Sequence, residues 1–349
     1  MMLKETIKSL ARQYHQETVE IRNHIHANPE LSFQEFETSK YIKAQLEKLG
    51  IEYEDGFVKT GIVATIKGKD PSSKTIAMRA DIDALPILEE NDVAYKSQND
   101  GVMHACGHDV HSSIALGVLR ILKEIKEEFS GTLKLVFQPG EEKLPGGAAL
   151  MIEEGILDTI NASNIFGIHV MPTIDAGQVG FRSGIYMASA DEIYLTIKGK
   201  GGHAALPALN IDPLKMTAEI LLELYKIQPP SEDIPMVLAF GKMNADGATN
   251  VIPAQVTVEG TFRTMNEEWR MELHAMVTKI AQDIARSHGG ECEVLIKKGY
   301  PCLVNDHTMT ASARAAAEEF LGKDNVGELD LRMTADDFAT FSQSMPGCY

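Results

Sequence analysis

Four polar clusters in the first half of the chain carry side chains that bind metal ions or transfer protons. They are Arg79–Pro86, Met103–His111, Phe137–Glu142 and Gly167–His169. Each follows a short apolar run that is typical of a buried strand, or opens a predicted helix. In open α/β sheets, functional sites assemble at the carboxyl ends of the strands. Each cluster is a weak signal alone, but their convergence at one sheet edge predicts a single site.

Metal coordination is the chemistry that these residue types favour. Cys106, His108, Glu142 and His169 supply one thiolate, two imidazoles and one carboxylate, donors that suit zinc and similar transition metals. Four such donors exceed the three protein ligands of a simple catalytic zinc site. A site for two metal ions about 3.5–4 Å apart therefore fits better. Any one of these residues alone is more often a buried, capping or surface residue.

A cysteine nucleophile is the competing interpretation of Cys106. His104 or His108 would then activate the thiol. That chemistry has no use for the nearby glutamates or for His169, and a thiolate that binds a metal is not a free nucleophile. The metal site is therefore the preferred interpretation.

The adjacent Glu141 and Glu142 are the candidates for proton transfer. Two neighbouring carboxylates in an apolar pocket repel each other unless a cation lies beside them. A metal ion bound by one of them relieves this repulsion and leaves the other to take a proton from an attacking water. Taken alone, such a pair is more often a solvated acidic turn.

Three residues further along the chain are weaker candidates. A glycine-rich turn ends at His203 and would present its imidazole at a surface; it lacks the Gly-Lys-Ser/Thr ending of a phosphate loop. Asn250 precedes an apolar run, and Arg263 lies near the end of a predicted strand, where either would hold a substrate carboxylate. His203 also fits an incidental hairpin residue. Asn250 and Arg263 taken alone are more often a turn residue and a surface ion-pair partner.

The elements that must position the four clusters alternate between strands and helices. Gly50 is a natural C-terminal cap for the second predicted helix. Helices are predicted over residues 3–25, 36–49, 110–129 and 148–154, and strands over residues 61–67, 75–78, 133–137 and 165–168. This alternation predicts an α/β fold with a mixed sheet flanked by helices on both faces.

The order of elements changes after about residue 188. Strands are predicted over residues 192–198, 235–243, 255–263 and 291–298, and helices over residues 213–227 and 267–288. This β-α-β-β-α-β order is the split ferredoxin-like pattern. After residue 300 the chain returns to helices. We therefore predict a catalytic domain of residues 1–184 and 300–349, with a ferredoxin-like α+β domain inserted at residues 185–299.

Composition limits the class of protein. The 349 residues are 44% hydrophobic and 24% charged, as in a globular protein of about two domains. The net charge of −17 argues against partners such as nucleic acid or an anionic membrane surface. No apolar run of about 18 residues and no signal-peptide pattern is evident, so a cytoplasmic location is expected. Four dispersed cysteines are too few for a disulfide framework.

Seven motifs occur in the order in which a known family has them. They are Arg79–Pro86, Met103–Asp109, Phe137–Glu142, Gly167–His169, Gly199–His203, Asn250–Pro253 and Gly260–Arg263. The sequence resembles the metal-dependent amidohydrolases of the aminoacylase/carboxypeptidase superfamily. Within it, the likeness is to the hippurate-hydrolase-like branch that acts on N-acyl amino acids. The resemblance runs from His26 to the C-terminus.

The resemblance implies a role for each candidate site residue of the catalytic domain. Two divalent metal ions are implied, which would be zinc, manganese, cobalt or nickel. The implied metal ligands are Cys106, His108, Glu142 and His169. Glu141 would be the general base and acid, and Asp83 would lie behind the metal ligands.

The resemblance also implies that the inserted domain is a lid through which two chains dimerise. His203 would reach the active site of a neighbouring subunit and stabilise an oxyanion there. Asn250 and Arg263 would contact the carboxylate end of the substrate. The implied partners are a small N-acyl amino acid and a second copy of the chain, in a homodimer or a higher homo-oligomer.

The sequence departs from the family at three places. The family's last histidine ligand lies beyond the position of Tyr349, where this sequence stops, so we expect a truncated chain with one metal ligand missing. Pro207-Ala208 stands where the family has Pro-His, and Asp336-Asp337-Phe338 stands where it has Glu-Asp-Phe. Both changes are expected to alter substrate preference.

The sequence as a whole predicts hydrolysis of the amide bond of N-acetyl- or N-benzoyl-type amino acids. Glu141 would accept a proton from the attacking water, and lid closure would bring His203 to the oxyanion. Two alternatives stay open: a di- or aminopeptidase on the same scaffold, and a non-catalytic dimeric binding protein. The cysteine at position 106 argues against the peptidase, and the intact Glu141-Glu142 pair argues against the binding protein.

Overall fold

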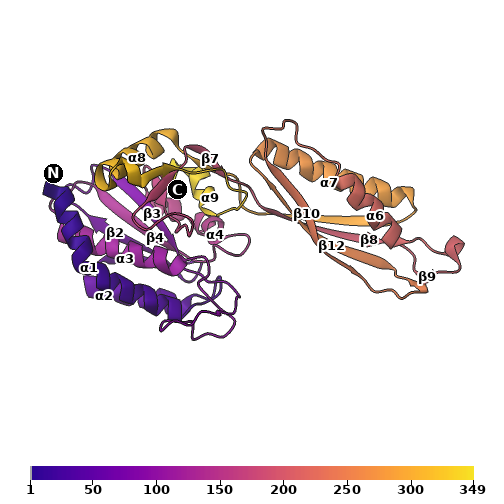
Figure 1. Cartoon of the computed structure of the whole chain (residues 1–349), viewed down its shortest axis with the longest axis horizontal. Helices are drawn as coiled ribbons and strands as arrows, with labels where there is room; N and C mark the ends of the chain where they lie inside the picture. Colours follow the sequence, from indigo (N-terminus) through magenta and orange to yellow (C-terminus); the bar gives the residue numbers. More distant parts are fainter. Residues whose placement is uncertain (1) are drawn as a thin grey trace. The chain divides into compact units, whose positions relative to one another are not determined.

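The computed structural model describes residues 2–349, which form two compact units (Figure 1). The first unit contains the described residues up to Tyr186, together with Val304–Asp330 and Asp336–Tyr349. The second unit contains Met187–Leu303 and the short segment Leu331–Ala335. The boundaries predicted from the sequence lie at residues 184 and 300, and the short segment is not predicted to be part of the second unit.

A six-stranded mixed sheet forms the centre of the first unit. Its strands, in spatial order, are β1 (Glu52–Phe57), β2 (Gly61–Lys67), β4 (Thr132–Gln138), β3 (Thr75–Asp81), β5 (Ile165–Gly167) and β16 (Gly347–Cys348). The first three strands pair in antiparallel fashion, whereas β4, β3, β5 and β16 are parallel. The carboxyl ends of β3, β4 and β5 therefore lie at the same edge of the sheet.

Three helices cover one face of this sheet: α1 (Met2–Ala27), α2 (Phe36–Leu49) and α3 (His108–Glu124). Leu46 and Leu116 pack with Ile62 and Phe137 in one buried hydrophobic cluster. The helix α2 ends as predicted, because Gly50 adopts the left-handed conformation at φ 60° and caps it. The main core of the unit therefore lies between the sheet and these helices.

Along each strand, side chains point alternately into this core and to the opposite face of the sheet. The helices of the remaining part are α4 (Gly147–Glu153), α5 (Ile156–Ile160), α8 (His307–Leu321) and α9 (Phe338–Ser344). The helix α9 packs against β5 and β16. Two short pairs complete the unit: β6 (Val179–Phe181) with β15 (Val326–Glu328), and β7 (Gly184–Met187) with β14 (Leu303–Asn305). A 3₁₀ turn spans Lys323–Asn325.

The second unit is a four-stranded antiparallel sheet with two helices. Its elements, in chain order, are β8 (Asp191–Lys198), α6 (Pro213–Leu224), β10 (Met236–Ala245), β12 (Gln255–Thr264), α7 (Glu267–Ser287) and β13 (Glu291–Lys298). The spatial strand order is β10-β12-β8-β13. Chain order and strand order are those of a ferredoxin-like α+β unit.

The helices α6 and α7 cover one face of that sheet. Every second residue of β8 is buried, and Ile193, Leu195 and Ile197 pack with Ile220 and Val277 of the two helices. The side chain of Asp212 caps α6, and that of Asn266 caps α7. A two-stranded ribbon, β9 (Gly202–His203) with β11 (Val251–Ile252), and a 3₁₀ turn at Pro207–Leu209 complete the unit.

Some elements end at other residues than those predicted from the sequence. The strand predicted to end at residue 78 continues to Asp81, because Ala80 and Asp81 pair in register with β4. The helix α3 ends at Glu124, because Ile125 leaves the helical conformation while remaining in the core. The edge strand β1 was not expected, because its sequence is mostly polar and exposed. Among the described residues, no helix has the length and apolar character needed to cross a membrane.

Candidate active site

The four polar clusters meet at the carboxyl edge of the sheet in the first unit. Asp81 ends β3, Gln138 ends β4, and His169 follows β5 by two residues. His108 opens α3 directly after Gly107, whose positive φ of 88° turns the chain from the preceding loop into the helix. Parallel strands thus bring segments that are far apart in the sequence to one place, as expected for an α/β sheet.

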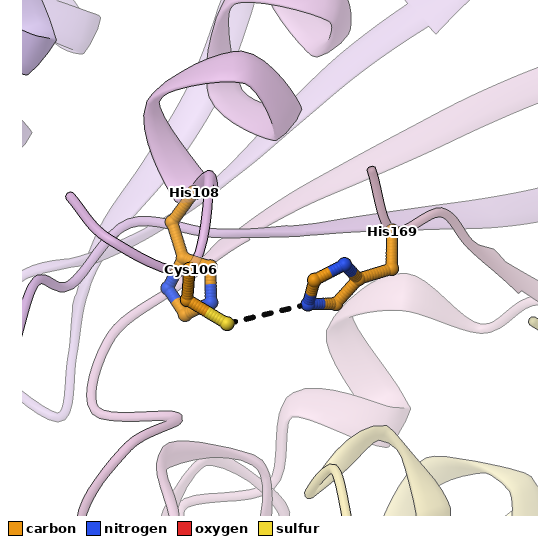
Figure 2. Close-up of side chains that lie close together, drawn as sticks. All are labelled: Cys106, His108 and His169. Carbon is orange, nitrogen blue, oxygen red and sulfur yellow. Dashed lines mark hydrogen bonds between the residues drawn. The ribbon is translucent and has the colours of Figure 1, made fainter. Parts of the chain in front are cut away.

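Cys106, His108 and His169 lie together in this site (Figure 2). The Cys106 Sγ atom is 3.3 Å from Nε2 of His169. One potential ligand atom from each of the three residues lies within 4.8 Å of the others. Burial raises the pKa of the Cys106 thiol. A cysteine nucleophile needs a lowered pKa, so the free thiol is poorly suited to that role.

The two histidines present the same nitrogen to the site. Nδ1 of His108 lies 2.9 Å from the backbone oxygen of Asp83, and Nδ1 of His169 lies 2.6 Å from the backbone oxygen of Val170. A nitrogen that faces a carbonyl oxygen carries the proton and donates it. In the neutral form of each ring, Nε2 is then the unprotonated nitrogen. Metal-binding histidines have this arrangement, with the other nitrogen held by an oxygen acceptor.

Glu141 and Glu142 form a second group that shares His108 with the first. Nε2 of His108 lies 3.9 Å from a carboxylate oxygen of each glutamate. Burial raises the pKa of both carboxyl groups, and the nearby charges of Asp336 and Asp337 raise that of Glu141 further. Buried carboxylates of this kind need a cation to remain ionised together.

The residues of the two groups fit divalent metal ions. Oε1 of Glu142 is buried and has no hydrogen-bond partner among the described residues. This oxygen is therefore available as a ligand for a cation. The donor set combines a thiol, two imidazole Nε2 atoms and a carboxylate, which is the chemistry of zinc and related transition metals. The backbone N–H of Glu142 donates to Asp83 at 2.9 Å, which fixes the start of that side chain.

His111 lies beside the site but its two nitrogens are already engaged. The backbone N–H of Val170 donates to Nε2 of His111 at 2.9 Å, so Nδ1 carries the proton and donates to Asp81 at 2.6 Å. Asp81 also binds the buried guanidinium of Arg79. His111 therefore holds the segment that follows β5, next to His169. Arg79, Asp81 and His111 stand within sequence motifs, but their roles are not predicted from the sequence, since only the fold reveals their contacts.

Asp336 and Asp337 also approach Glu141, and both are held by the protein. Asp337 accepts hydrogen bonds from the Gln138 side chain at 2.8 Å and from Arg79 at 2.7 Å. Burial raises the pKa of Asp337 to about 7. Asp336 accepts a hydrogen bond from the hydroxyl of Tyr349. In the sequence, this pair stands out only as a departure from the family's Glu-Asp-Phe, which does not indicate that it lies near Glu141.

The structure places His203 and Asn250 side by side in the second unit. His203 is exposed in β9, opposite Val251 of β11, and the backbone N–H of Ala204 donates to the oxygen of Asn250 at 3.0 Å. Arg263 is near the far end of β12 and donates to the backbone oxygen of Met333 at 3.1 Å. Within this unit, His203 and Asn250 are therefore neighbours, whereas Arg263 lies at a separate position.

The fold and the donor set define a metal-dependent hydrolase with an α/β catalytic unit. The family model of "Peptidase family M20/M25/M40" matches residues 77–349, and the chain belongs to this family. The chain is 37% identical over 343 residues to N-acetylcysteine deacetylase of Bacillus subtilis, with 97% of this chain and 88% of the relative covered. It is 36% identical over 306 residues to N-acyl-L-amino acid amidohydrolase of Geobacillus stearothermophilus, with 87% and 82% covered.

A solved structure supports the same family. The crystal structure of a dinuclear metal-binding peptidase of the M20 family from Bacillus subtilis matches with a TM-score of 0.81 and 34% identity, covering 97% of this chain and 88% of that one. The predicted family, the predicted metal-dependent amidohydrolase and the predicted α/β fold with a mixed sheet are confirmed.

Proposed function

We propose that the chain hydrolyses the amide bond of N-acyl amino acids. The observation that carries this proposal is the position of His108, which belongs both to the group with Cys106 and His169 and to the group with Glu141 and Glu142. The proposed metal ligands and the buried carboxylate of Glu141 therefore lie within one site. The names of the two curated relatives support N-acyl amino acids as the substrate class.

The proposed metal ligands are Cys106, His108, Glu142 and His169, for two ions of zinc, manganese, cobalt or nickel. Bound ions of this kind lower the pKa of water and polarise a carbonyl group. Asp83 orients the ligands from behind, through Nδ1 of His108 and the backbone of Glu142.

Glu141 performs the proton transfers in this proposal. Its buried carboxylate lies beside His108 and beside Asp336 and Asp337. Glu141 accepts a proton from the attacking water and later donates it to the nitrogen of the leaving amine. The same group thus serves both halves of the reaction.

The second unit supplies the remaining groups. We assign to it the role of a lid and dimerisation domain, in which the partner subunit's His203 donates a hydrogen bond to the oxyanion. We assign Asn250 and Arg263 to the carboxylate of the substrate; because they lie at separate places in the unit, the two would come from different subunits. The ten-residue strand β10 lies at the edge of its sheet, so one side of its backbone has no strand partner among the described residues. Such an edge pairs readily with a second chain, and sedimentation velocity would detect the dimer.

A peptidase is the second candidate, because the family and the solved relative both carry that word in their names. One assay separates the two functions. The chain is stripped with a chelator, zinc or manganese is added stepwise, and free amino acid is measured from N-acetyl and N-benzoyl amino acids and from unblocked dipeptides. Metal-dependent release from the acylated substrates alone supports the proposal. Preferential release from the dipeptides replaces it with the peptidase, and no release with any metal contradicts both.

A further inference from the structure

The turn that carries Glu141 and Glu142 is held by a buried carboxylate from a distant part of the chain. Glu35 occupies the N-cap position of α2, but its side chain makes no capping hydrogen bond there. It is 0% exposed and lies 105 residues before Gly140, whose backbone N–H donates to its Oε1 at 2.9 Å. The Glu35 carboxylate therefore stabilises the turn at Gly140 and not the start of its own helix.

Two further hydrogen bonds hold the Glu35 carboxylate in place. Oε1 also accepts the backbone N–H of Phe33 at 2.8 Å, and Oε2 accepts the hydroxyl of Thr60 at 3.0 Å. Three donors therefore fix the carboxylate in one orientation. An acceptor with two oxygens at these positions satisfies the otherwise unpaired N–H of Gly140, which is buried in the site.

The same segment also packs tightly against the turn. Gly140 has a positive φ of 65°, and a Cβ atom on it would lie 2.2 Å from the ring of Phe33. Phe33 itself has a positive φ of 67°. The backbone of the turn and the ring are thus in direct contact, and only glycine fits at position 140.

A second contact from this segment reaches the other end of the turn. The hydroxyl of Ser32 donates to Oδ2 of Asp83 at 2.6 Å, and the same oxygen accepts the backbone N–H of Glu142 at 2.9 Å. Residues 32–35 therefore hold the turn at Gly140 directly and at Glu142 through Asp83. Between these two fixed points lies Glu141.

We propose that Glu35 is a positioning residue that sets the direction of Glu141 and Glu142 through the backbone N–H of Gly140. This inference rests on the proposed roles of those two glutamates. Loss of the Glu35 carboxylate frees the start of the turn, so Glu141 no longer meets the attacking water and Glu142 no longer meets its metal ion in one fixed geometry.

Three substitutions at position 35 separate positioning from charge. In Glu35→Gln, the amide oxygen still accepts the two backbone N–H groups and the amide nitrogen donates to Thr60, so activity and metal affinity stay near those of the unchanged chain. In Glu35→Ala, kcat and the affinity for Zn²⁺ are each expected to fall about 10–100-fold, the range seen when groups behind metal ligands are removed. Glu35→Asp keeps the charge but is shorter by one methylene, and is expected to fall between them.

Two control variants isolate the contact with Gly140. Glu37→Ala removes an exposed carboxylate of the same helix whose ion pair among the described residues is with Lys40, and it is expected to keep kcat and Zn²⁺ affinity. Thr60→Val removes one of the two further donors to Glu35 and leaves the Gly140 contact in place. It is expected to lower kcat and Zn²⁺ affinity less than Glu35→Ala does.

Metal titration and the visible spectrum of the Co²⁺-loaded chain test the proposal without any substrate. The Co²⁺ bands depend on ligand geometry, so Glu35→Ala and Glu35→Asp are expected to shift them while Glu35→Gln does not. If Glu35→Ala folds and keeps the original spectrum and Zn²⁺ affinity, the proposal is wrong. It is also wrong if Glu35→Gln is as impaired as Glu35→Ala, since charge and not hydrogen bonding then matters. Because these readouts need no turnover, a failure of the proposed amidase activity is distinguishable from a failure of this inference.

Discussion

Asp83 binds Nδ1 of His108 through two oxygens, its backbone carbonyl at 2.9 Å and its carboxylate at 3.2 Å. The other carboxylate oxygen accepts the backbone N–H of Glu142. Hydrogen bonds with His108 and Ser32 hold the carboxylate ionised: burial raises the pKa of Asp83, but these bonds outweigh it, and the net shift is downward. Asp83 therefore orients two proposed metal ligands, His108 at the start of helix α3 and Glu142 in the turn after strand β4.

Replacing Asp83 by alanine is expected to weaken metal binding. His108 then keeps the backbone carbonyl of residue 83 but loses the carboxylate that also accepts from its Nδ1, and Glu142 loses the anchor of its backbone. Removal of such a group typically costs about 10–100-fold in metal affinity. Competition with a chromophoric chelator measures the affinity, and Asp92→Ala in an exposed loop is the matched control. An unchanged affinity in Asp83→Ala would remove this residue from the metal site.

Glu141→Gln is expected to abolish turnover and to keep the metal. The amide has nearly the same size but cannot accept the proton of the attacking water. Because Glu141 is buried beside Asp336 and Asp337, losing its charge also relieves repulsion, so the fold is expected to be at least as stable. Metal content by atomic emission and the rate of amino-acid release are measured on the same sample. Retained turnover would show that another group is the base.

His203→Ala is expected to lower kcat by about 10²–10³-fold, the cost of one oxyanion donor. Metal affinity stays unchanged, because the exposed His203 belongs to the ribbon of the second unit. His288→Ala, which removes another histidine of that unit paired with Glu219, is the control. Steady-state kinetics on an N-acetyl amino acid measure the effect, and equal rates for the two variants would exclude His203 from the reaction.

Much of the fold follows from periodicity and turn residues. The bounds of α2, β2 and β13 match the expected ones, because strong patterns and a capping glycine mark their ends. The order of elements from β8 to β13 is likewise readable from alternation and helical spacing. Short strands such as β6, β15 and β16 escape prediction, since two or three residues carry no period and depend on a distant partner.

The candidate site is partly readable from sequence for a related reason. Cys106, His108, Glu142 and His169 are chemically distinctive and follow strands or open a helix, so their convergence can be inferred. The supporting residues cannot, because ordinary types such as Glu35 and Asp337 acquire their function from contacts across more than a hundred residues. Arg79 shows the same limit: full burial of an arginine becomes intelligible only when its aspartate partners are known.

Asp191 in the second unit links strand β8 to helix α7 by a buried ion pair. Its carboxylate binds Nε of Arg270 at 2.9 Å and Nε2 of His274 at 2.6 Å, and accepts the backbone N–H of Gly299 at 2.9 Å. Burial raises the pKa of Asp191, but the hydrogen bonds with Arg270 and His274 outweigh it and lower the pKa to about 2. The folded state therefore binds a proton here less readily than the unfolded chain does.

This depressed pKa makes the second unit sensitive to acid. Its stabilising contribution of about 2 kcal/mol is complete above the unfolded pKa near 4 and is lost as the pH falls from there to about 2. Asp191→Asn removes that pH dependence and leaves the buried Arg270 with Glu267 as its remaining carboxylate partner. The unit is therefore expected to be less stable at neutral pH by up to about 3–5 kcal/mol, the range for removing one partner of a buried ion pair. The chain's single tryptophan, Trp269, is buried in α7 and reports the unfolding of this unit by fluorescence during urea denaturation.

Asp283→Asn, at an exposed ion pair of the same helix, is the control and is expected to change little. If Asp191→Asn unfolds at the same urea concentration as the unchanged chain at pH 7, the ion pair does not stabilise the unit.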